Sequence, residues 1–340
     1  MKPKMKKEEK KNKRVAVIGG GSWATALAKL LLANNERISW YMRRQNRIDE
    51  FKQRGYNPVY LSDIRFDVDR IDFHSDINAA CCDADILVIA IPSPFFLESA
   101  TKITCDLSDK IIVSAVKGIV PDKNLIITDF FASRFGCKDE NLIVIGGPCH
   151  AEEVALERLS YLTIGCHDRE KSVEFAEMLR SPALRTIVSN DVAGIEYAAV
   201  LKNVYAIAGG VISGMKAGDN FMAMMACNAA REMRTFIDTV APMKRDICHS
   251  AYLGDLLVTA YSRFSRNHNF GAMIGKGYSV NAAKMEMEMV AEGYYGAKCI
   301  YQINESKTKV DMPILTAVYK IIYERLSPRE AVRMMAPTFS

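Results

Sequence analysis

Residues 262–267 bring together side chains that can bind phosphate. The segment reads Ser-Arg-Phe-Ser-Arg-Asn and follows Asp255 after a short, mostly apolar stretch. Guanidinium groups donate paired, charge-assisted hydrogen bonds to phosphate oxygens, and hydroxyl and amide groups add further donors. The segment therefore predicts a place where a phosphate group could sit.

Lys202 interrupts an otherwise apolar stretch that has helical composition. A lysine on a buried helix can extend its ammonium group to solvent, which is one interpretation. If Lys202 instead points into a cleft near Lys117, burial and the neighbouring charge would lower its pKa towards the range useful for proton transfer. A nearby Asp255 would oppose that shift, and the sequence leaves the balance open.

A nucleotide-binding turn is predicted near the N-terminus. Gly19, Gly21 and Ala24 match the pattern G-x-G-x-x-G/A after the apolar run at residues 15–18. The glycines allow a sharp turn and a close backbone approach to a pyrophosphate, which the N-terminus of the following helix stabilises. A glycine-rich turn of some other α/β protein is the alternative, but the strand before it and the helix after it favour a dinucleotide.

The end of the second predicted strand bears on the choice between NAD and NADP. Proteins that prefer NAD place an acidic residue about twenty residues past the glycines, on the ribose 2′-hydroxyl. Here the chain has Arg43 and Arg44 instead. Because guanidinium groups suit a 2′-phosphate, the sequence favours NADP as the preferred cofactor, with NAD not excluded. Two solvated loop arginines are the alternative interpretation.

Apolar runs predict an α/β fold with a Rossmann-type, doubly wound, mainly parallel sheet. Runs of this length suit strands that are covered on both faces, and the segments between them suit helices. Ligands bind beyond the carboxyl ends of such strands, where Lys117 and Gly147 lie. The predicted strands after the first cover residues 37–42, 85–91, 110–115, 141–145, 161–164 and 185–188.

Beyond about residue 190 the composition changes to Ala, Met and Glu at helical spacing, over residues 195–214 and 220–240. This pattern predicts an all-helical C-terminal domain. We expect a basic disordered tail at residues 1–13, a dinucleotide-binding domain at 14–190 and a helical substrate-binding domain at 191–340. A chain of 340 residues, 49% of them hydrophobic, has enough core for two domains.

The positive charge of the chain belongs to its tail. The formal net charge is +5, and residues 1–14 carry eight Lys or Arg against two Glu, which leaves −1 for the rest. A charge run of this kind is usually solvated, so we expect a solvated tail and no nucleic-acid binding. There is no secretory signal and no other run long enough to span a bilayer, which favours a cytoplasmic protein.

The nine cysteines are scattered, and their spacing suggests neither zinc binding nor any other metal site. Most are expected to be small buried hydrophobes in a reducing compartment. Cys149 and His150 are adjacent, which could suggest a thiol–imidazole pair. Neighbours in sequence need not face each other, and no supporting Asn or Asp pattern identifies a nucleophile and base.

From residue 15 to about residue 333 the chain resembles bacterial-type NAD(P)-dependent glycerol-3-phosphate dehydrogenases. Each matching motif is weak alone, but their order and spacing together are highly specific. The motifs are residues 19–28, 91–93, 116–118, 147–148, 151–154, 201–203, 232–233, 253–256, 265–267, 270–271, 292–293 and 312–314, together with Asn220 and Thr259.

The resemblance implies reversible reduction of dihydroxyacetone phosphate to sn-glycerol 3-phosphate, which would supply phospholipid synthesis. Lys202 matches the general acid/base, Lys117 a second lysine that contacts substrate and cofactor, and Asp255 the residue that positions them. The resemblance also implies substrate contacts at Gly147, Cys149, Asn203, Thr259, Ser265, Arg266 and Asn267. It implies cofactor contacts at Gly19, Gly21, Ser22, Trp23, Arg43, Arg44, Ala151, Arg266, Val290 and Glu292.

Some positions depart from the family pattern. The family usually has a hydroxyl residue at the position of Cys149, so a side-chain hydrogen bond there would be weaker. It commonly has basic residues at the positions of Met222 and Asn228, and their absence would affect secondary contacts alone. A dehydrogenase acting on a β-hydroxyacid or 6-phosphogluconate is the alternative enzyme. A nucleotide-binding sensor without turnover is the alternative from another class, although it would need no proton donor. The helical domain could support a homodimer.

Overall fold

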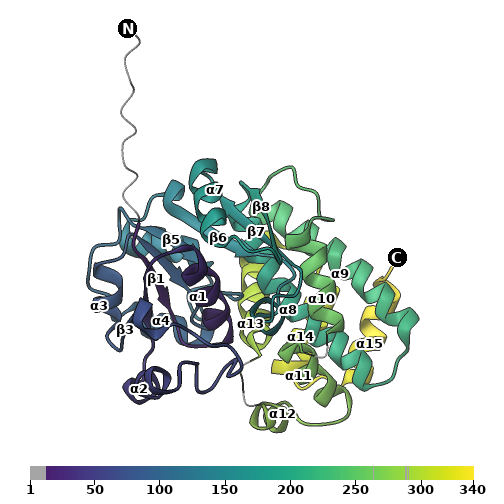
Figure 1. The fold of residues 1–340 in the computed structure, drawn as a ribbon. Coiled ribbons are helices and arrows are strands. Elements are labelled where there is room, and N and C mark those ends of the chain that lie inside the picture. Colours follow the sequence, from purple (N-terminus) through teal and green to yellow (C-terminus); the bar gives the residue numbers. More distant parts are fainter. Residues whose placement is uncertain (1–12, 263, 288, 290) are drawn as a thin grey trace.

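The computed structural model describes residues 13–262, 264–287, 289 and 291–340. Val290 and all of the predicted tail except Lys13 lie outside the described residues, and the Lys13 ammonium lies 2.6 Å from a carboxylate oxygen of Glu174. Figure 1 shows a sheet with its helices, coloured purple to teal, beside the green and yellow helices of the C-terminal part. The predicted fold class, a Rossmann-type sheet followed by a helical domain, is confirmed.

Eight strands form one sheet in the order β3-β2-β1-β4-β5-β6-β7-β8. Neighbouring strands are parallel except for the antiparallel pair β6 and β7. The order reverses between β1 and β4, which is where doubly wound sheets bind their ligands. The strands are β1 Val15–Ile18, β2 Ile38–Tyr41, β3 Ile71–His74, β4 Ile86–Ile89, β5 Ile111–Ser114, β6 Leu142–Gly146, β7 Ser160–Cys166 and β8 Leu184–Ser189.

Both faces of the central strands β1, β4, β5 and β6 are covered, as the apolar runs predict. Within β1, Val15 and Val17 pack into the core on one face, whereas Ala16 and Ile18 pack into the core on the other. The covering helices are α1 Ser22–Asn34, α2 Gln45–Arg54, α3 Ile77–Cys82, α4 Ser93–Ala100, α5 Ile127–Phe135, α6 Ala151–Ala155 and α7 Arg169–Met178, with the 3₁₀ turns η1 Val68–Arg70 and η2 Asp139–Asn141.

The C-terminal part is built around α8, which begins at Val192 and ends at Gly214. Among the described residues α8 is the one helix long and apolar enough to cross a membrane. No run of that length was expected from the sequence. The most apolar window of α8 is wholly buried, as in the core helix of a globular protein. The other elements are α9 Asp219–Val240, η3 Ser250–Gly254 (a π-helix), α10 Asp255–Tyr261, α11 Arg266–Gly275, α12 Val280–Glu286, α13 Glu292–Ile303, η4 Asn304–Thr308, α14 Pro313–Tyr323, α15 Pro328–Met335 and η5 Ala336–Thr338.

Helices α8 and α11 approach each other closely through glycines. A Cβ atom on Gly210 would lie 2.0 Å from the carbonyl oxygen of His268, and one on Gly271 would lie 2.1 Å from that of Ile207. Any larger residue would therefore push the two backbones apart. This contact fixes the start of α11, which carries Arg266, against the side of α8.

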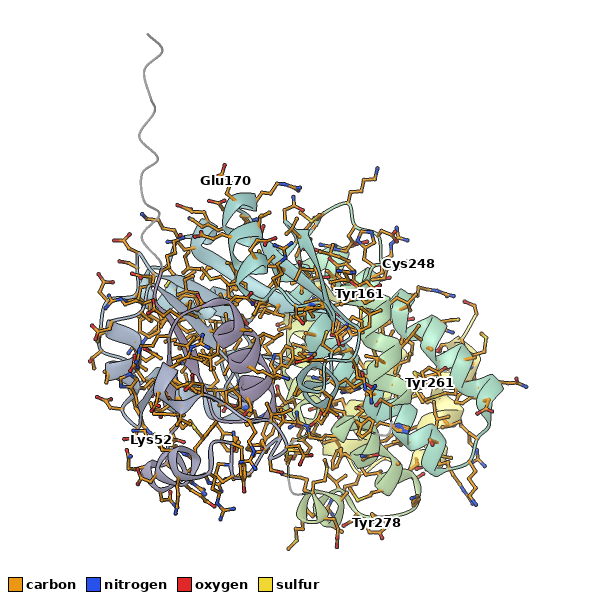
Figure 2. The ribbon with its side chains drawn as sticks, viewed as in Figure 1. Lys52, Tyr161, Glu170, Cys248, Tyr261 and Tyr278 are labelled. Atoms are coloured by element: carbon orange, nitrogen blue, oxygen red, sulfur yellow. The ribbon has the colours of Figure 1, made fainter. Side chains whose placement is uncertain are left out.

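Charged and polar side chains lie at the periphery of both parts. Lys52 and Glu170 lie at the outer surface of the N-terminal part, and Tyr278 lies at that of the C-terminal part (Figure 2). Lys202 and Asp255 are instead buried, and they line a cavity to which both parts contribute residues.

Candidate active site

One cavity of about 450 Å³ is lined by residues that follow β1, β4, β5 and β6 and by residues of α8, α10, α11 and α13. Most of the predicted site residues meet there. They are Gly21, Ser22, Trp23, Arg44, Lys117, Cys149, Ala151, Lys202, Asn203, Asp255, Thr259, Ser265, Arg266, Asn267 and Glu292. Gly19, Arg43 and Gly147 are not among the lining residues, and Val290 lies outside the described residues.

Lys202 points into the cavity and not to bulk solvent, so the second of the two interpretations is correct. Its side chain is 3% exposed, and its ammonium group donates a hydrogen bond to the carboxylate of Asp255, which is 1% exposed. The ammonium group of Lys117 lies 4.0 Å from the other carboxylate oxygen. The site thus joins two lysines to one buried aspartate.

These neighbours set the protonation of Lys202. Burial lowers the pKa of its amine, and the charge of Lys117 lowers it too, whereas Asp255 raises it, with a net value of about 7. An amine whose pKa lies near neutrality can both donate and accept a proton at physiological pH. The cluster therefore suits general acid/base catalysis.

Lys117 is held in place by backbone groups. Its ammonium group donates to the carbonyl oxygens of Cys149 at 3.2 Å and Gly147 at 3.5 Å, and it lies 5.3 Å from the centre of the Trp23 ring. Gly147 has a φ of +112°, and a Cβ there would lie 2.7 Å from a carbonyl oxygen of β7, so only glycine fits this turn. Gly147 thus shapes the site through its backbone.

A chain of amide groups ties the helices of the site together. The Asn203 side chain donates to the carbonyl oxygen of Lys117 at 2.7 Å and accepts from the Asn267 amide at 2.9 Å. The Asn267 oxygen accepts from the backbone N–H of Gly293 at 2.9 Å. These bonds use one N–H and the oxygen of the Asn267 amide in positioning α8, α11 and α13, and its second N–H leaves the predicted phosphate contact a prediction.

The N-terminus of α11 opens onto the cavity. The Ser265 hydroxyl accepts from the backbone N–H of His268 at 3.2 Å and so caps the helix. The first backbone N–H groups of a helix have no partner within it, and they carry a partial positive charge. With the Arg266 guanidinium beside them, these groups have the donors and the positive charge that a phosphate dianion requires.

Thr259 and Cys149 are less suited to bind substrate through their side chains. The Thr259 hydroxyl donates to the backbone carbonyl of Asp255 at 2.6 Å, one helical turn earlier. The Cys149 thiol donates to the carbonyl oxygen of Tyr161 at 3.0 Å, and burial raises the pKa of this thiol to about 12. A neutral, hydrogen-bonded thiol is a poor nucleophile, which argues against catalysis by a Cys149–His150 pair.

The turn after β1 fits a dinucleotide. Gly19 has a φ of +137°, and a Cβ there would lie 2.5 Å from the carbonyl oxygen of Ala90, whereas a Cβ on Gly21 would meet nothing within 4 Å. No side chain caps α1, so the backbone N–H groups at Ser22 and Trp23 stay free to face a pyrophosphate. The indole N–H of Trp23 is also buried without a hydrogen-bond partner.

The remaining predicted cofactor residues lie around this turn. Arg44 lines the cavity and Arg43 does not, although both residues are exposed. Ala151 begins α6, and Glu292 begins α13 with one carboxylate oxygen buried and unpaired. Burial raises the pKa of the Glu292 carboxyl, although Arg266 lowers it.

Three aromatic residues of the cavity were missed by the sequence analysis: Tyr60, Phe95 and Phe264. Phe95 and Phe264 are 44% and 66% exposed although they line the cavity, so they lie at its mouth. Phe264 lies inside the segment singled out for phosphate binding, where attention to polar groups hid it. No pattern in the sequence identifies Tyr60 or Phe95.

The departures from the family pattern lie away from this cavity, except for Cys149. Met222 and Asn228 are buried on α9, where the Asn228 amide donates to a backbone carbonyl at 2.8 Å, and neither lines the cavity. Within the described ranges, no group of three or more His, Cys, Asp or Glu side chains is arranged to hold a metal ion.

Comparison with known proteins connects this arrangement to one family. The N-terminal and C-terminal models of NAD-dependent glycerol-3-phosphate dehydrogenase match residues 14–172 and 191–333. Glycerol-3-phosphate dehydrogenase [NAD(P)+] of Staphylococcus saprophyticus is 32% identical over 324 residues, which cover 94% of this chain and 96% of that protein. The enzyme of the same name from Agathobacter rectalis is 32% identical over 320 residues, 94% of each chain.

Solved structures give the same result. The crystal structure of glycerol-3-phosphate dehydrogenase from Coxiella burnetii superposes with a TM-score of 0.88 at 26% identity, covering 95% of this chain and 98% of that one. The structure of D-mandelate dehydrogenase superposes with a TM-score of 0.59 at 12% identity, covering 92% of this chain and 98% of that one. This likeness shows a shared fold and nothing further. The chain therefore belongs to the NAD-dependent glycerol-3-phosphate dehydrogenase family, whose members are oxidoreductases acting on a CH–OH group.

Proposed function

We propose that this protein reduces dihydroxyacetone phosphate to sn-glycerol 3-phosphate with a reduced nicotinamide cofactor, and that it catalyses the reverse oxidation. The observation that carries the proposal is the buried Lys202–Asp255 pair with Lys117 beside it, in a cavity shared by a nucleotide-binding turn and a phosphate-binding helix N-terminus. The reaction needs these three features together: a proton donor, a cofactor site and a phosphate site.

When bound, the cofactor supplies the hydride that the C2 carbonyl carbon receives. The Lys202 ammonium donates its proton to the oxygen of that carbonyl as negative charge develops there. In the oxidation the neutral amine accepts the hydroxyl proton. Asp255 orients the Lys202 amine and keeps its pKa from falling further, which retains part of the amine in the protonated form at neutral pH.

Lys117 acts on the same oxygen through its charge. Its ammonium group is fixed by two backbone carbonyls, so it is oriented before the substrate arrives. A charge that needs no reorientation during the reaction stabilises an alkoxide-like transition state effectively. The N–H groups and guanidinium at the start of α11 hold the phosphate and direct the carbonyl towards Lys202.

We propose NADPH as the preferred cofactor, with Arg44 as the residue that contacts the 2′-phosphate. Arg44 lines the cavity together with Gly21, Ser22 and Trp23 of the turn after β1, whereas Arg43, which is also exposed, is not among the lining residues. We further propose a cytoplasmic protein that supplies glycerol phosphate for phospholipid synthesis, forms a homodimer and does not bind nucleic acid. The division into a tail at 1–13, a cofactor domain at 14–190 and a substrate domain at 191–340 is part of this proposal.

Substrate profiling tests the proposal. The purified protein is given NADPH with dihydroxyacetone phosphate, with unphosphorylated dihydroxyacetone and with a β-ketoacid, and NADP⁺ with 6-phosphogluconate. We expect turnover with dihydroxyacetone phosphate and a much lower kcat/KM with the unphosphorylated ketone, because the α11 site would be empty. Preference for the β-ketoacid or for 6-phosphogluconate would refute the assignment. Binding of NADPH without turnover of any substrate would favour a sensor.

A further inference from the structure

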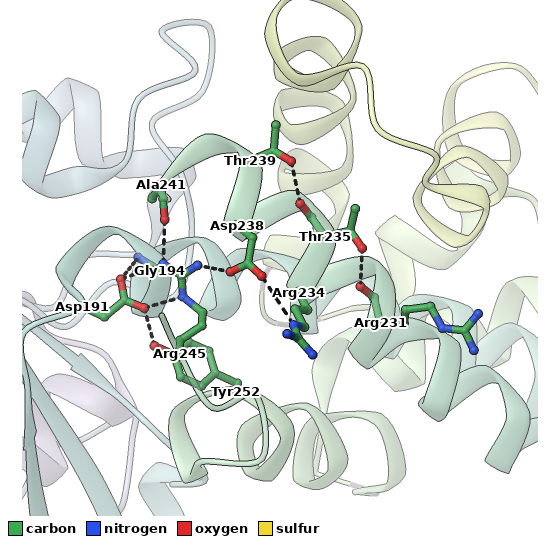
Figure 3. Close-up of polar contacts among 10 residues, drawn as sticks. All are labelled: Asp191, Gly194, Arg231, Arg234, Thr235, Asp238, Thr239, Ala241, Arg245 and Tyr252. Carbon is green, nitrogen blue, oxygen red and sulfur yellow. Dashed lines mark hydrogen bonds and ion pairs between the residues drawn. The ribbon is translucent and has the colours of Figure 1, made fainter. Parts of the chain in front are cut away.

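Arg245 forms a buried ion cluster outside the cavity. It lies in the loop after α9, its side chain is 2% exposed, and its guanidinium donates to both carboxylate oxygens of Asp191, at 2.8 and 3.3 Å. It also donates to the Asp238 carboxylate and, at 2.7 Å, to the carbonyl oxygen of Ala241. Figure 3 shows Arg245 between the two carboxylates. One guanidinium therefore links the start of α8 to the end of α9.

Asp191 extends this cluster in two directions. Its carboxylate caps α8 by accepting from the backbone N–H of Gly194 at 3.0 Å. It also accepts a hydrogen bond from the Tyr252 hydroxyl, which lies beside it in Figure 3. Burial opposes the charge of Asp191, but the hydrogen bonds from Arg245 and Tyr252 outweigh it and hold the pKa of this carboxyl below its usual value. The carboxylate is thus a charged centre with donors on three sides.

Of the two elements joined at Asp191, α8 carries Lys202 and η3 leads directly into Asp255. Tyr252 belongs to the π-helix η3, which ends at Gly254, directly before Asp255. Helix α8 begins at Val192 and carries Lys202 on its third turn. The position of Asp255 relative to Lys202 therefore depends on how η3 is attached to the start of α8. The Tyr252–Asp191 hydrogen bond is one such attachment, and Arg245 holds its acceptor in place.

We propose that Arg245 is a positioning residue for the reaction, because through Asp191 and Tyr252 it holds the η3 turn so that the Asp255 carboxylate meets the Lys202 amine. Arg245 does not line the cavity, so any effect on turnover passes through these contacts. The inference rests on the proposed role of Lys202 as acid and base. A purely structural role, in which Arg245 only stabilises the loop after α9, is the competing account.

The two accounts differ in the pH dependence of the reaction. Lys202 interacts electrostatically with several charged or titratable groups. They are Asp255 on α10, Lys117 after β5, Cys149 and His150 after β6, and Glu292 on α13. Asp255 is the one that raises the pKa of Lys202. If Asp255 moves away, burial and Lys117 remain, so that pKa falls. Reduction needs the protonated amine, so its rate would then decline at a lower pH than in the wild type.

The test uses Tyr252→Phe, Arg245→Met and Arg245→Lys in the full chain. Tyr252→Phe removes one hydroxyl and keeps the ring, so this variant is expected to fold even if Arg245→Met does not. Arg234→Met is the matched control, because Arg234 also contacts Asp238, at 3.5 Å, but does not contact Asp191 or Tyr252. Thermal unfolding and NADPH binding are measured for each variant, followed by the pH profile of dihydroxyacetone phosphate reduction.

We expect Arg245→Met to lower kcat roughly 10- to 100-fold, as small displacements of catalytic groups do. The alkaline decline of the reduction rate should move down by about 0.5–1 pH unit in both Arg245→Met and Tyr252→Phe. Arg245→Lys should recover part of the loss, and Arg234→Met should match the wild type. An unchanged pH profile and kcat in folded Tyr252→Phe would overturn the inference, whatever its melting temperature.

A second measurement separates this inference from the proposed role of Lys202. Titration of ¹³Cε-labelled lysine by NMR reports the pKa of Lys202 directly, with Lys202→Arg used to assign its signal. A lower pKa of Lys202 in Tyr252→Phe supports the positioning role even if Lys202 proves dispensable for turnover. An unchanged pKa refutes the positioning role even if Lys202 is essential.

Discussion

Replacement of Asp255 by Asn changes the charge of the catalytic cluster while almost keeping its shape. Asp255 and Lys202 are 1% and 3% exposed, so solvent screens their interaction little. A hydrogen bond to a charged group contributes about 1.5–3 kcal/mol, and its loss corresponds to a fall of roughly 1–2 pH units in the pKa of Lys202. From a starting value of about 7, the protonated fraction at pH 7 falls roughly 5- to 50-fold.

The assay is the pH dependence of dihydroxyacetone phosphate reduction at saturating NADPH, from about pH 5 to 9. The reduction uses the protonated amine, so the rate is present below the pKa of Lys202 and is lost as the pH rises through it. Asp255→Asn should move that decline towards acid, and part of the lost rate should return at low pH. If the folded variant declines at the same pH as the wild type, Asp255 does not control the protonation of Lys202.

Three further predictions concern the phosphate site, the cofactor site and the helix contact. Arg266→Ala should raise KM for dihydroxyacetone phosphate about 10- to 100-fold, because charge-assisted hydrogen bonds are lost, while KM for unphosphorylated dihydroxyacetone changes little. Arg44→Ala should lower the ratio of kcat/KM for NADPH to that for NADH by about tenfold or more, and an unchanged ratio would remove Arg44 from cofactor selection. Gly271→Ala should reduce the free energy of unfolding by about 1–3 kcal/mol in urea titrations, since its Cβ would lie 2.1 Å from a carbonyl oxygen of α8.

The sheet could be predicted largely because its strands are covered on both faces. Such strands are continuous apolar runs, as in β4 and β5, and the helices between them follow from composition. Strand β3 was missed because Ile71, Asp72, Phe73 and His74 alternate apolar and polar residues at the edge of the sheet. The antiparallel pairing of β6 and β7 was not predicted either, because an apolar run does not indicate whether a strand is parallel or antiparallel to its neighbour.

The residue types of the candidate site could be predicted from the sequence, but their arrangement in space could not. The direction of Lys202 depends on the close contact of α8 with α11, which sequence periodicity does not report. One signal was available: Gly210 and Gly214 in the predicted helical segment 195–214, and Gly271 and Gly275 elsewhere in the predicted helical domain, repeat at a spacing of four. Small residues at that spacing allow two helices to pack closely, here with α11 beside α8.

Residue type predicted only part of what Asn267 does. An amide beside an arginine predicts a phosphate contact, which stays a prediction, but it does not predict the bonds of this amide to Asn203 and Gly293. Nothing in the sequence indicated the role of Arg245, because neither this residue nor its partners Asp191 and Asp238 belong to a motif. Contacts of this kind follow from the packed structure alone.

The most direct test of the account compares wild type and Lys202→Ala in the initial rate of NADPH oxidation with dihydroxyacetone phosphate. NADPH binding is measured on the same samples by nicotinamide fluorescence. We predict rapid oxidation by the wild type, and a rate about 10²- to 10⁴-fold lower in the variant with nearly unchanged NADPH affinity, because only the proton donor is lost. Turnover at the wild-type rate in Lys202→Ala would contradict the assignment of Lys202 as the acid and base.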